Sequence, residues 1–332
     1  MYRPRAVREA SQSCGSIDAC SRPYVLGGRS LMAQRIVRVT CPDRPGLVGT
    51  ITTAFADRGM NILQLDQFTD ADALPQTAAP VHGSSGGSFF FRAVVDSPAD
   101  RTPDDEAADA EFRRLRERLM NSVDESTVEI QPYPSTLRVA VLASKTDHCV
   151  VEMIRRAQTG QLSGEVVKVV ANHDVHGALC DFYGIEHVVV PNADLSKEEH
   201  EARVLEAVGD DVDVIVLARY MRILSESFLV KAPCPIINIH HSFLPSFIGA
   251  NPYQRAHDRG VKMIGATAHY VTADLDEGPI IEQDVVRVDH RHTKDELVKS
   301  GADVERSVLY RAVKAHCEGR IFLDGDRTVV FG

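Results

Sequence analysis

The feature that most constrains the fold is a series of short, almost entirely apolar runs in the second part of the chain. The first is LRVAVLA at residues 137–143. A strand that is buried on both faces has a near-continuous hydrophobic sequence of this kind, whereas a strand with one solvent-exposed face alternates hydrophobic and polar residues. Similar runs occur at 165–171, 187–190, 213–218 and 236–240, and helical stretches lie between them. Strands that alternate with helices in this way predict a parallel, doubly wound sheet.

The pattern changes after this series. Residues 265–272 and 280–288 read as two strands joined by a turn, and a long helix is expected over about 293–318. The tail is expected to form a closing hairpin around Asp324 and Gly325. We therefore expect residues 136–332 to form a Rossmann-like α/β domain with a mostly parallel sheet.

The preceding part of the chain has the order of a small ferredoxin-like unit. Strands are predicted at 35–41, 60–69, 89–96 and 126–132, and helices from residue 47 and over 104–121. In the first helix, Leu47, Ile51, Ala54 and Phe55 fall on one face. The resulting βαββαβ order predicts a second domain over 34–134.

Two segments lack any regular pattern. Residues 1–33 are rich in Arg, Ser and Gly, and we expect a disordered extension there. A transit peptide is the alternative, but Glu9 and Asp18 interrupt that composition. Residues 71–88 are rich in Ala, Pro, Gly and Ser, which predicts a long mobile loop.

Composition excludes several classes of partner. The formal net charge is -10, which argues against nucleic acid because phosphate contacts need clustered Lys and Arg. No apolar run approaches the ~20 residues of a membrane span. The seven Cys are scattered and odd in number, which fits reduced thiols in a cytoplasmic protein better than a disulfide framework.

The strongest chemical signal lies at the end of the last apolar run, in IINIHHSFLPSFIG at 236–249. Asn238 and His240 are two residues apart in a strand, so their side chains share a face. Ligands of open α/β sheets bind outside the carboxyl ends of the strands. Asn and His can stabilise a developing oxyanion, and His can also give a proton to a leaving nitrogen.

Two further segments carry related signals. The turn within 265–281 collects Asp274, Asp276 and Glu277, and a carboxylate near an imidazole can orient a water molecule. The junction LARYMRIL at 217–224 offers backbone groups and apolar walls for a heterocycle. Taken singly, the three segments also have ordinary structural interpretations: a capped strand end, an acidic turn and a packed strand-to-helix junction.

Together the three segments resemble the folate-dependent formyltransferase domain. Its motif combines Asn238-Ile239-His240, a turn from His269 to Gly278 with Asp276 in the catalytic place, and the junction starting at Met221. The resemblance implies that Asn238, His240 and Asp276 are catalytic and that no cofactor or metal is needed. It implies the following substrate-binding residues: Met221, Arg222, Ile223, Leu224, His241, Thr272 and Asp274.

The N-terminal unit resembles an ACT domain, a regulatory module for small molecules. The residues that carry this resemblance are TCPDRPGL at 40–47 and Asn61-Ile62. It implies an amino-acid effector such as glycine or methionine, and a homo-oligomer with paired ACT domains. The implied effector-binding residues are Asp43, Gly46, Leu47, Asn61 and Ile62.

An ACT domain fused to a folate formyl domain resembles the formyltetrahydrofolate deformylases. The resemblance covers roughly 34–332, and the loop at 71–88 is longer than expected for this family. It implies hydrolysis of 10-formyltetrahydrofolate to formate and tetrahydrofolate, in one-carbon and purine metabolism.

Two alternatives are weighed against this interpretation. A formyltransferase acting on an amine such as glycinamide ribonucleotide needs a glycine-rich loop that cradles a phosphate. Here the loop at 144–149 has no glycine, and Asp147 would repel a phosphate. In addition, His241 follows the catalytic His, where transferases usually have Pro. A catalytically dead sensor has no need of Asn238, His240 and Asp276 together.

Overall fold

The computed structural model describes residues 33–70, 87–97, 106–134, 137–193, 195–246 and 252–332. The predicted extension therefore lies outside the described residues except for Ala33, and the predicted long loop lies outside them except for Gly87 and Ser88. Residues 135–136, at the predicted domain boundary, also lie outside them. In the described ranges, no helix has the length and apolarity to cross a membrane.

The first part of the chain has the predicted βαββαβ order. Its elements are β1 (Gln34–Pro42), α1 (Leu47–Ala56), β2 (Asn61–Asp70), β3 (Ser88–Asp96), α2 (Glu106–Ser122) and β4 (Thr127–Tyr133). The four strands form one antiparallel sheet in the order β2-β3-β1-β4. The first and third strands, β1 and β3, lie at the centre of the sheet and pair with each other, as the ferredoxin-like order requires.

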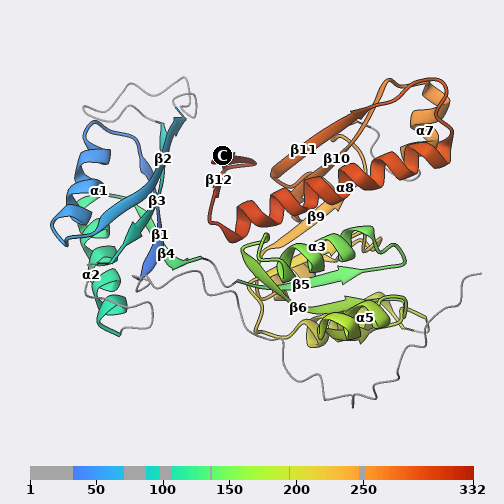
Figure 1. Cartoon of the computed structure of the whole chain (residues 1–332), viewed down its shortest axis with the longest axis horizontal. Helices are drawn as coiled ribbons and strands as arrows, with labels where there is room; N and C mark the ends of the chain where they lie inside the picture. Colours follow the sequence, from blue (N-terminus) through green and yellow to red (C-terminus); the bar gives the residue numbers. More distant parts are fainter. Residues whose placement is uncertain (1–32, 71–86, 98–105, 135–136, 194, 247–251) are drawn as a thin grey trace, which may run out of the picture. The chain divides into compact units, whose positions relative to one another are not determined.

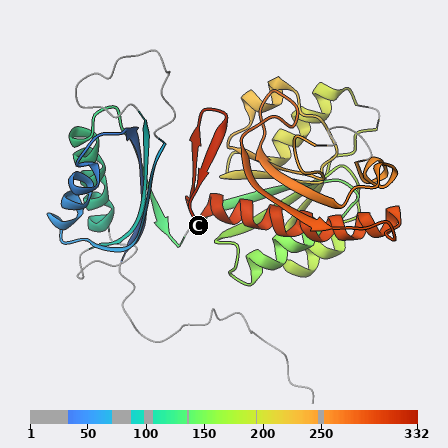
Figure 2. The same cartoon turned by 90° about the horizontal axis from the view of Figure 1, so that it is seen from above.

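The core of this part lies between the sheet and its two helices, which cover one face (Figure 2). Alternate residues of β1, such as Val37 and Val39, point into it because successive strand side chains face opposite ways. Ile51 and Phe55 of α1, four residues apart, meet them from one side of that helix. The predicted apolar helix face is thus the buried one.

The second part is built on a seven-stranded sheet. Its strands are β5 (Leu137–Ala143), β6 (Gly164–Ala171), β7 (Glu186–Val189), β8 (Val214–Ala218), β9 (Ile236–His240), β10 (Met263–Tyr270) and β11 (Ile280–Arg287). The order is β11-β10-β9-β8-β5-β6-β7. The five strands from β9 to β7 are parallel, and the hairpin β10–β11 adds two antiparallel strands at one edge. The mostly parallel sheet is therefore confirmed.

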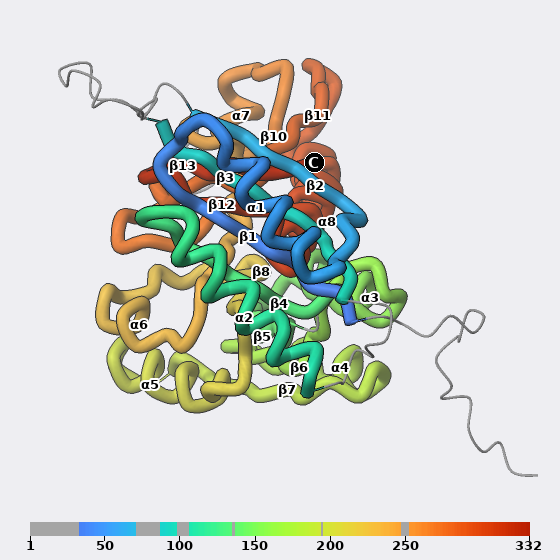
Figure 3. Tube along the Cα trace, turned by 90° about the vertical axis from the view of Figure 1, so that its left-hand side faces the viewer, coloured from blue at the N-terminus to red at the C-terminus, as the bar shows by residue number. Residues whose placement is uncertain are grey.

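Helices cover both faces of this sheet (Figures 1 and 3). On one face lie α3 (His148–Gln158), α4 (Gly177–Tyr183) and α8 (Lys294–Cys317); on the other lie α5 (Lys197–Val208) and α6 (Glu226–Lys231). In β5, Val139 and Val141 face the first group, and Ala140 and Leu142 face the second. Burial on both faces explains why the strand is apolar throughout.

Two smaller features complete the chain. Helix α7 (Pro252–Arg259) packs Tyr253 and Ala256 against Ile264 of β10 and Leu297 of α8. The predicted closing hairpin is present as β12 (Ile321–Asp324) and β13 (Arg327–Val330).

Candidate active site

A cavity of about 570 Å³ opens beyond the carboxyl ends of β8 and β9. This is the edge at which ligands of parallel sheets bind. The structure places all ten predicted catalytic and substrate-binding residues around it: Met221, Arg222, Ile223, Leu224, Asn238, His240, His241, Thr272, Asp274 and Asp276. Three separate segments of the sequence thus meet at one cavity.

The pairing of β9 with β10 fixes the floor of this cavity. Asn238 lies opposite His269, and His240 lies opposite Thr267. Asn238 and His240 share a face of β9, as their spacing predicts. His240 is buried, and its Nδ1 already faces a partner across the turn that follows β10.

That partner is Asp276. Its Oδ2 lies 3.2 Å from His240 Nδ1. The hydrogen bond from His240, reinforced by the neighbouring His269, holds the pKa of the Asp276 carboxyl well below its usual range. Asp276 is therefore an anion, and His240 carries its proton on Nδ1. His240 Nε2 is buried and has no hydrogen-bond partner in the described part of the chain, so it is available to a substrate.

A tight turn holds Asp276 in place. Asp276 has a φ of 59°, in the left-handed region that Asp tolerates better than most residues. Two residues later, a Cβ at Gly278 would lie 1.8 Å from the carbonyl oxygen of Tyr270. Only glycine lets the chain approach the end of β10 this closely, so the turn places the carboxylate beside His240.

His269 begins the predicted motif but is not among the predicted site residues. Its Nδ1 lies 2.9 Å from the carbonyl oxygen of Tyr270, so Nδ1 donates there. Nε2 then accepts from Asn238 Nδ2 at 3.1 Å. One Asn238 amide proton is thus held by His269, which orients the other toward the cavity. His269 lies 3.7 Å from Asp276 Oδ1, too far for a hydrogen bond, so this oxygen keeps capacity for a water molecule.

The backbone around the cavity is unusual. Arg219, Met221 and Asp276 all have φ near 60°. Left-handed conformations of non-glycine residues cost on the order of 1–3 kcal/mol each and gather at functional sites. Met221 and Ile223 are more than 60% exposed, so they offer apolar surface to a ligand at the cavity mouth.

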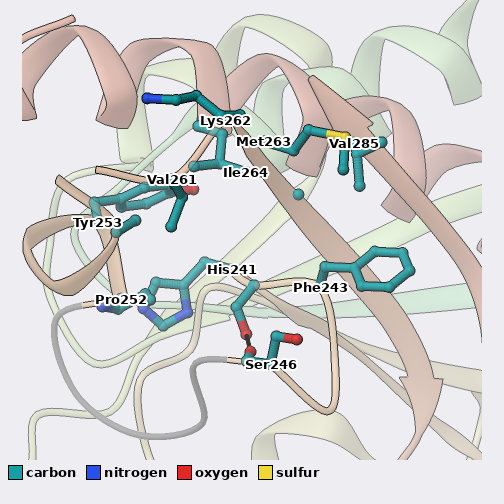
Figure 4. A pocket seen from close by; sticks show the side chains of 13 residues that line it. His241, Phe243, Ser246, Pro252, Tyr253, Val261, Lys262, Met263, Ile264 and Val285 are labelled. Carbon is teal, nitrogen blue, oxygen red and sulfur yellow. Dashed lines mark hydrogen bonds between the residues drawn. The ribbon is translucent and has the colours of Figure 1, made fainter. Parts of the chain in front are cut away.

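A second cavity of about 420 Å³ adjoins the first, and Figure 4 shows the side chains that line it. His241, Pro252 and Tyr253 line both cavities and so separate them. The His241 ring lies 5.2 Å from that of His240 and 6.0 Å from that of Tyr253. Burial, reinforced by the charge of Arg219, lowers the pKa of His241 to about 4. His241 is therefore a neutral imidazole beside the catalytic pair.

One polar cluster near this wall contains none of the predicted site residues. His148, Cys149 and Glu305 bring potential metal-ligating atoms within 4.8 Å of one another, although Glu305 is far in sequence from the other two. Burial, reinforced by Glu305, raises the pKa of the Cys149 thiol well above its usual range. A protonated thiol is a poor metal ligand, because the thiolate is the form that binds.

The predicted effector residues do not come together within one chain. Gly46, with a φ of 90°, and Leu47 start α1 just after β1 ends at Pro42. Asn61, however, pairs with Asp96, whereas Pro42 pairs with Ser88 at the far end of β3. The eight-residue separation along β3 corresponds to about 26 Å. One ligand could touch both groups only if a second copy supplied one of them.

Family comparisons agree with the two-part organisation. The family model described as Formyl transferase matches residues 137–313, and the one described as ACT domain matches residues 35–112. A formyltetrahydrofolate deformylase of Mycobacterium tuberculosis is 45% identical over 291 residues, which is 88% of each chain.

Solved structures give the same result. A formyltetrahydrofolate deformylase from Pseudomonas syringae pv. tomato is similar with a TM-score of 0.80 and 36% identity, over 93% of this chain and 96% of that one. A glycinamide ribonucleotide transformylase from Symbiobacterium toebii is similar with a TM-score of 0.57 and 30% identity, over 59% of this chain and 95% of that one.

Proposed function

Because the chain belongs to the formyltetrahydrofolate deformylase family, we propose that it hydrolyses 10-formyltetrahydrofolate to formate and tetrahydrofolate. The observation that carries this proposal is the arrangement of Asn238, His240 and Asp276 around one cavity. His240 lines the cavity, Asp276 orients its ring through Nδ1, and its Nε2 has no hydrogen-bond partner among the described residues.

The chemistry follows from these positions. Asp276 Oδ1 holds a water molecule and accepts its proton as the water oxygen attacks the formyl carbon. The free Asn238 amide proton stabilises the oxyanion of the tetrahedral intermediate, and His240 does so from Nε2 when that nitrogen carries a second proton. The bond from carbon to the folate nitrogen then breaks as that nitrogen takes the proton from His240 Nε2, and formate leaves. The proton that Asp276 accepted from water returns to His240, so the site is restored. The residues that line the mouth, including Met221 and Ile223, hold the folate ring.

No metal or cofactor enters this scheme. Asn238 and His240 supply the electrostatic stabilisation that a metal ion would otherwise give. The three potential ligands at Glu305 are already bonded within the protein or protonated.

For the ACT domain we propose an amino-acid effector, glycine or methionine. Gly46 opens α1, where free backbone N–H groups favour a carboxylate. Because Asn61 lies at the other end of the sheet, the proposed site joins Gly46 of one chain to Asn61 of another, and regulation requires an oligomer. Activity in the cytoplasm, as part of one-carbon and purine metabolism, belongs to the same proposal.

The direct experiment measures formate release from 10-formyltetrahydrofolate with no amine acceptor present. We expect formate in step with loss of the donor, and no acceleration by glycinamide ribonucleotide. The Asp276→Asn protein is the matched control for contaminating activity. Donor loss that depends on the amine, with a formylated amine as product and no formate, would show that the protein is a transferase.

A further inference from the structure

A fully buried carboxylate lies beside the candidate active site. Glu305 belongs to the middle of α8, and its side chain is 2% exposed. His148 Nε2 donates to Glu305 Oε2 at 2.8 Å, and the Tyr253 hydroxyl donates to Oε1 at 2.5 Å. Arg219 Nε lies 3.5 Å from Oε2. Both carboxylate oxygens are therefore occupied by groups from outside α8.

The three partners have the composition of an anion-binding site. They come from three separate elements: His148 is the first residue of α3, Arg219 follows β8, and Tyr253 is near the start of α7. A guanidinium, an imidazole N–H and a hydroxyl that converge on one point are ligands for a phosphate or carboxylate. Arg219 Nε and Nη1 are buried and make no hydrogen bond in the described part of the chain.

Glu305 is ionised where it lies. Burial by itself would raise the pKa of the carboxyl, but the hydrogen bond from His148, the charge of Arg219 and the hydrogen bond from Tyr253 outweigh burial and hold the pKa below its usual value. A buried charge without such partners would be strongly destabilising. The cluster therefore keeps a negative charge at this point.

The same face of α8 is shaped to fit the cluster. Gly301 lies one helical turn before Glu305, and positions four residues apart share a helix face. A Cβ at position 301 would lie 2.0 Å from the Tyr253 hydroxyl oxygen. Glycine is unfavourable inside a helix, so its presence here is explained by the room that the Tyr253 hydroxyl needs to reach Glu305.

The cluster forms part of the wall of the catalytic cavity. Arg219 and Tyr253 line that cavity together with His240 and His241. The cluster also includes His148, the first residue of α3, which follows β5, the first strand of this sheet. Doubly wound folds bind phosphate groups at this position. A second substrate with an anionic group would meet Glu305 there.

We propose that Glu305 is an internal anion that fills an anion-binding subsite beside the catalytic cavity and so excludes an anionic second substrate, such as a phosphate-bearing amine. Water then remains the nucleophile. The inference that water is the nucleophile rests on the proposed function, whereas the inference that Glu305 fills an anion-binding subsite does not.

Two variants test whether the subsite exists. Glu305→Ala removes the carboxylate and leaves space beside Arg219, whereas Glu305→Gln removes the charge and keeps the space filled. Each protein is titrated with sodium acetate and with inorganic phosphate, at ionic strength kept constant with sodium chloride, and its Tm is measured.

We expect acetate or phosphate to raise the Tm of the Glu305→Ala protein in a saturable manner, by about 3–6 °C at concentrations well above Kd. The Tm of the wild type and of the Glu305→Gln protein should not respond. A folded Glu305→Ala protein that responds to neither anion would overturn the proposal, as would a saturable rise for the wild type.

If the Glu305→Ala protein does not fold in chloride, the same titration becomes a refolding experiment. Acetate should then restore the native circular dichroism spectrum, and failure to do so would refute an anion site. A zinc-dependent rise in the Tm of the wild type that is lost in Glu305→Gln would also refute it, since the cluster with Cys149 would then be a metal site. None of these measurements uses formate release, so they fail or succeed independently of the proposed hydrolysis.

Discussion

His240 and Asp276 form a directed pair: Nδ1 of the imidazole lies 3.2 Å from Oδ2 of the carboxylate, while Nε2 on the other side of the ring has no partner among the described residues. The carboxylate fixes which nitrogen carries the proton. It also places the unbonded nitrogen at the cavity, where a reacting carbonyl would lie. The first prediction follows from this pair.

Replacing Asp276 by Asn should lower kcat by at least about 100-fold, because the group that accepts the proton of the attacking water is lost. Folate binding, measured by equilibrium titration, should change little, since the ground-state contacts lie elsewhere. Asp274 in the same turn is the matched control. Asp274→Asn should raise KM more than it lowers kcat. A near-normal kcat for Asp276→Asn would contradict the catalytic assignment.

Chelation should leave formate release unchanged. The oxyanion is stabilised by Asn238 and His240, so no step needs a metal ion. The measurement compares initial rates before and after prolonged incubation with a strong chelator. Loss of activity that one specific metal restores would disprove this expectation.

Regulation by glycine or methionine should depend on two chains. Titration of either amino acid against formate release should give a saturable change in rate. Gly46→Ala and Asn61→Ala proteins should each lose the response, and an equal mixture reassembled from both should recover part of it, because some interfaces then combine an intact Gly46 with an intact Asn61. If neither amino acid changes the rate of the wild type, the ACT domain does not have this role. If the mixture does not recover the response, the site is not shared between two chains.

Gly301→Ala should destabilise the protein by about 1–3 kcal/mol, because the new methyl group overlaps the Tyr253 hydroxyl. Gly49 in α1 is the matched control, since a Cβ there would meet nothing within 4 Å. Gly49→Ala should stabilise by about 0.5–1 kcal/mol through helix propensity alone. Urea unfolding of the three proteins decides the sign of each change. Equal effects at both positions would show that Tyr253 is not constrained by Gly301.

Stability should fall as pH drops from about 6.5 toward 4. Burial lowers the pKa of His241 and of His316 to about 4 in the folded state. In this window the unfolded chain takes up protons that the folded protein does not, so the free energy of unfolding decreases with falling pH. His316 accepts a hydrogen bond from Tyr270, and His316→Gln keeps an acceptor while removing the titration. The slope near pH 5.5 should decrease by about 1.4 kcal/mol per pH unit, one proton equivalent. An unchanged slope would exclude His316 as a source.

The sequence alone determined most of the helices and strands, and its motifs predicted ten of the residues that line the cavity. The apolar run at 137–143 predicts a strand buried on both faces because such a strand has no wet side. The two-residue spacing of Asn238 and His240 predicts that they share a face because strand geometry repeats every two residues. These are local rules, and the observed β5 and β9 follow them. Asp276, the third catalytic residue, was predicted from the resemblance of its turn to the family motif.

Only the tertiary structure decided which distant groups meet. His148 and Glu305 are 157 positions apart, and no local period relates them. Their contact depends on the packing of α8 against α3. The separation of Gly46 from Asn61 likewise depends on strand register, which pairs Asn61 with Asp96 and Pro42 with Ser88. Local sequence sets period and propensity, but the packing of the whole chain sets which buried charges become partners and which predicted neighbours are kept apart.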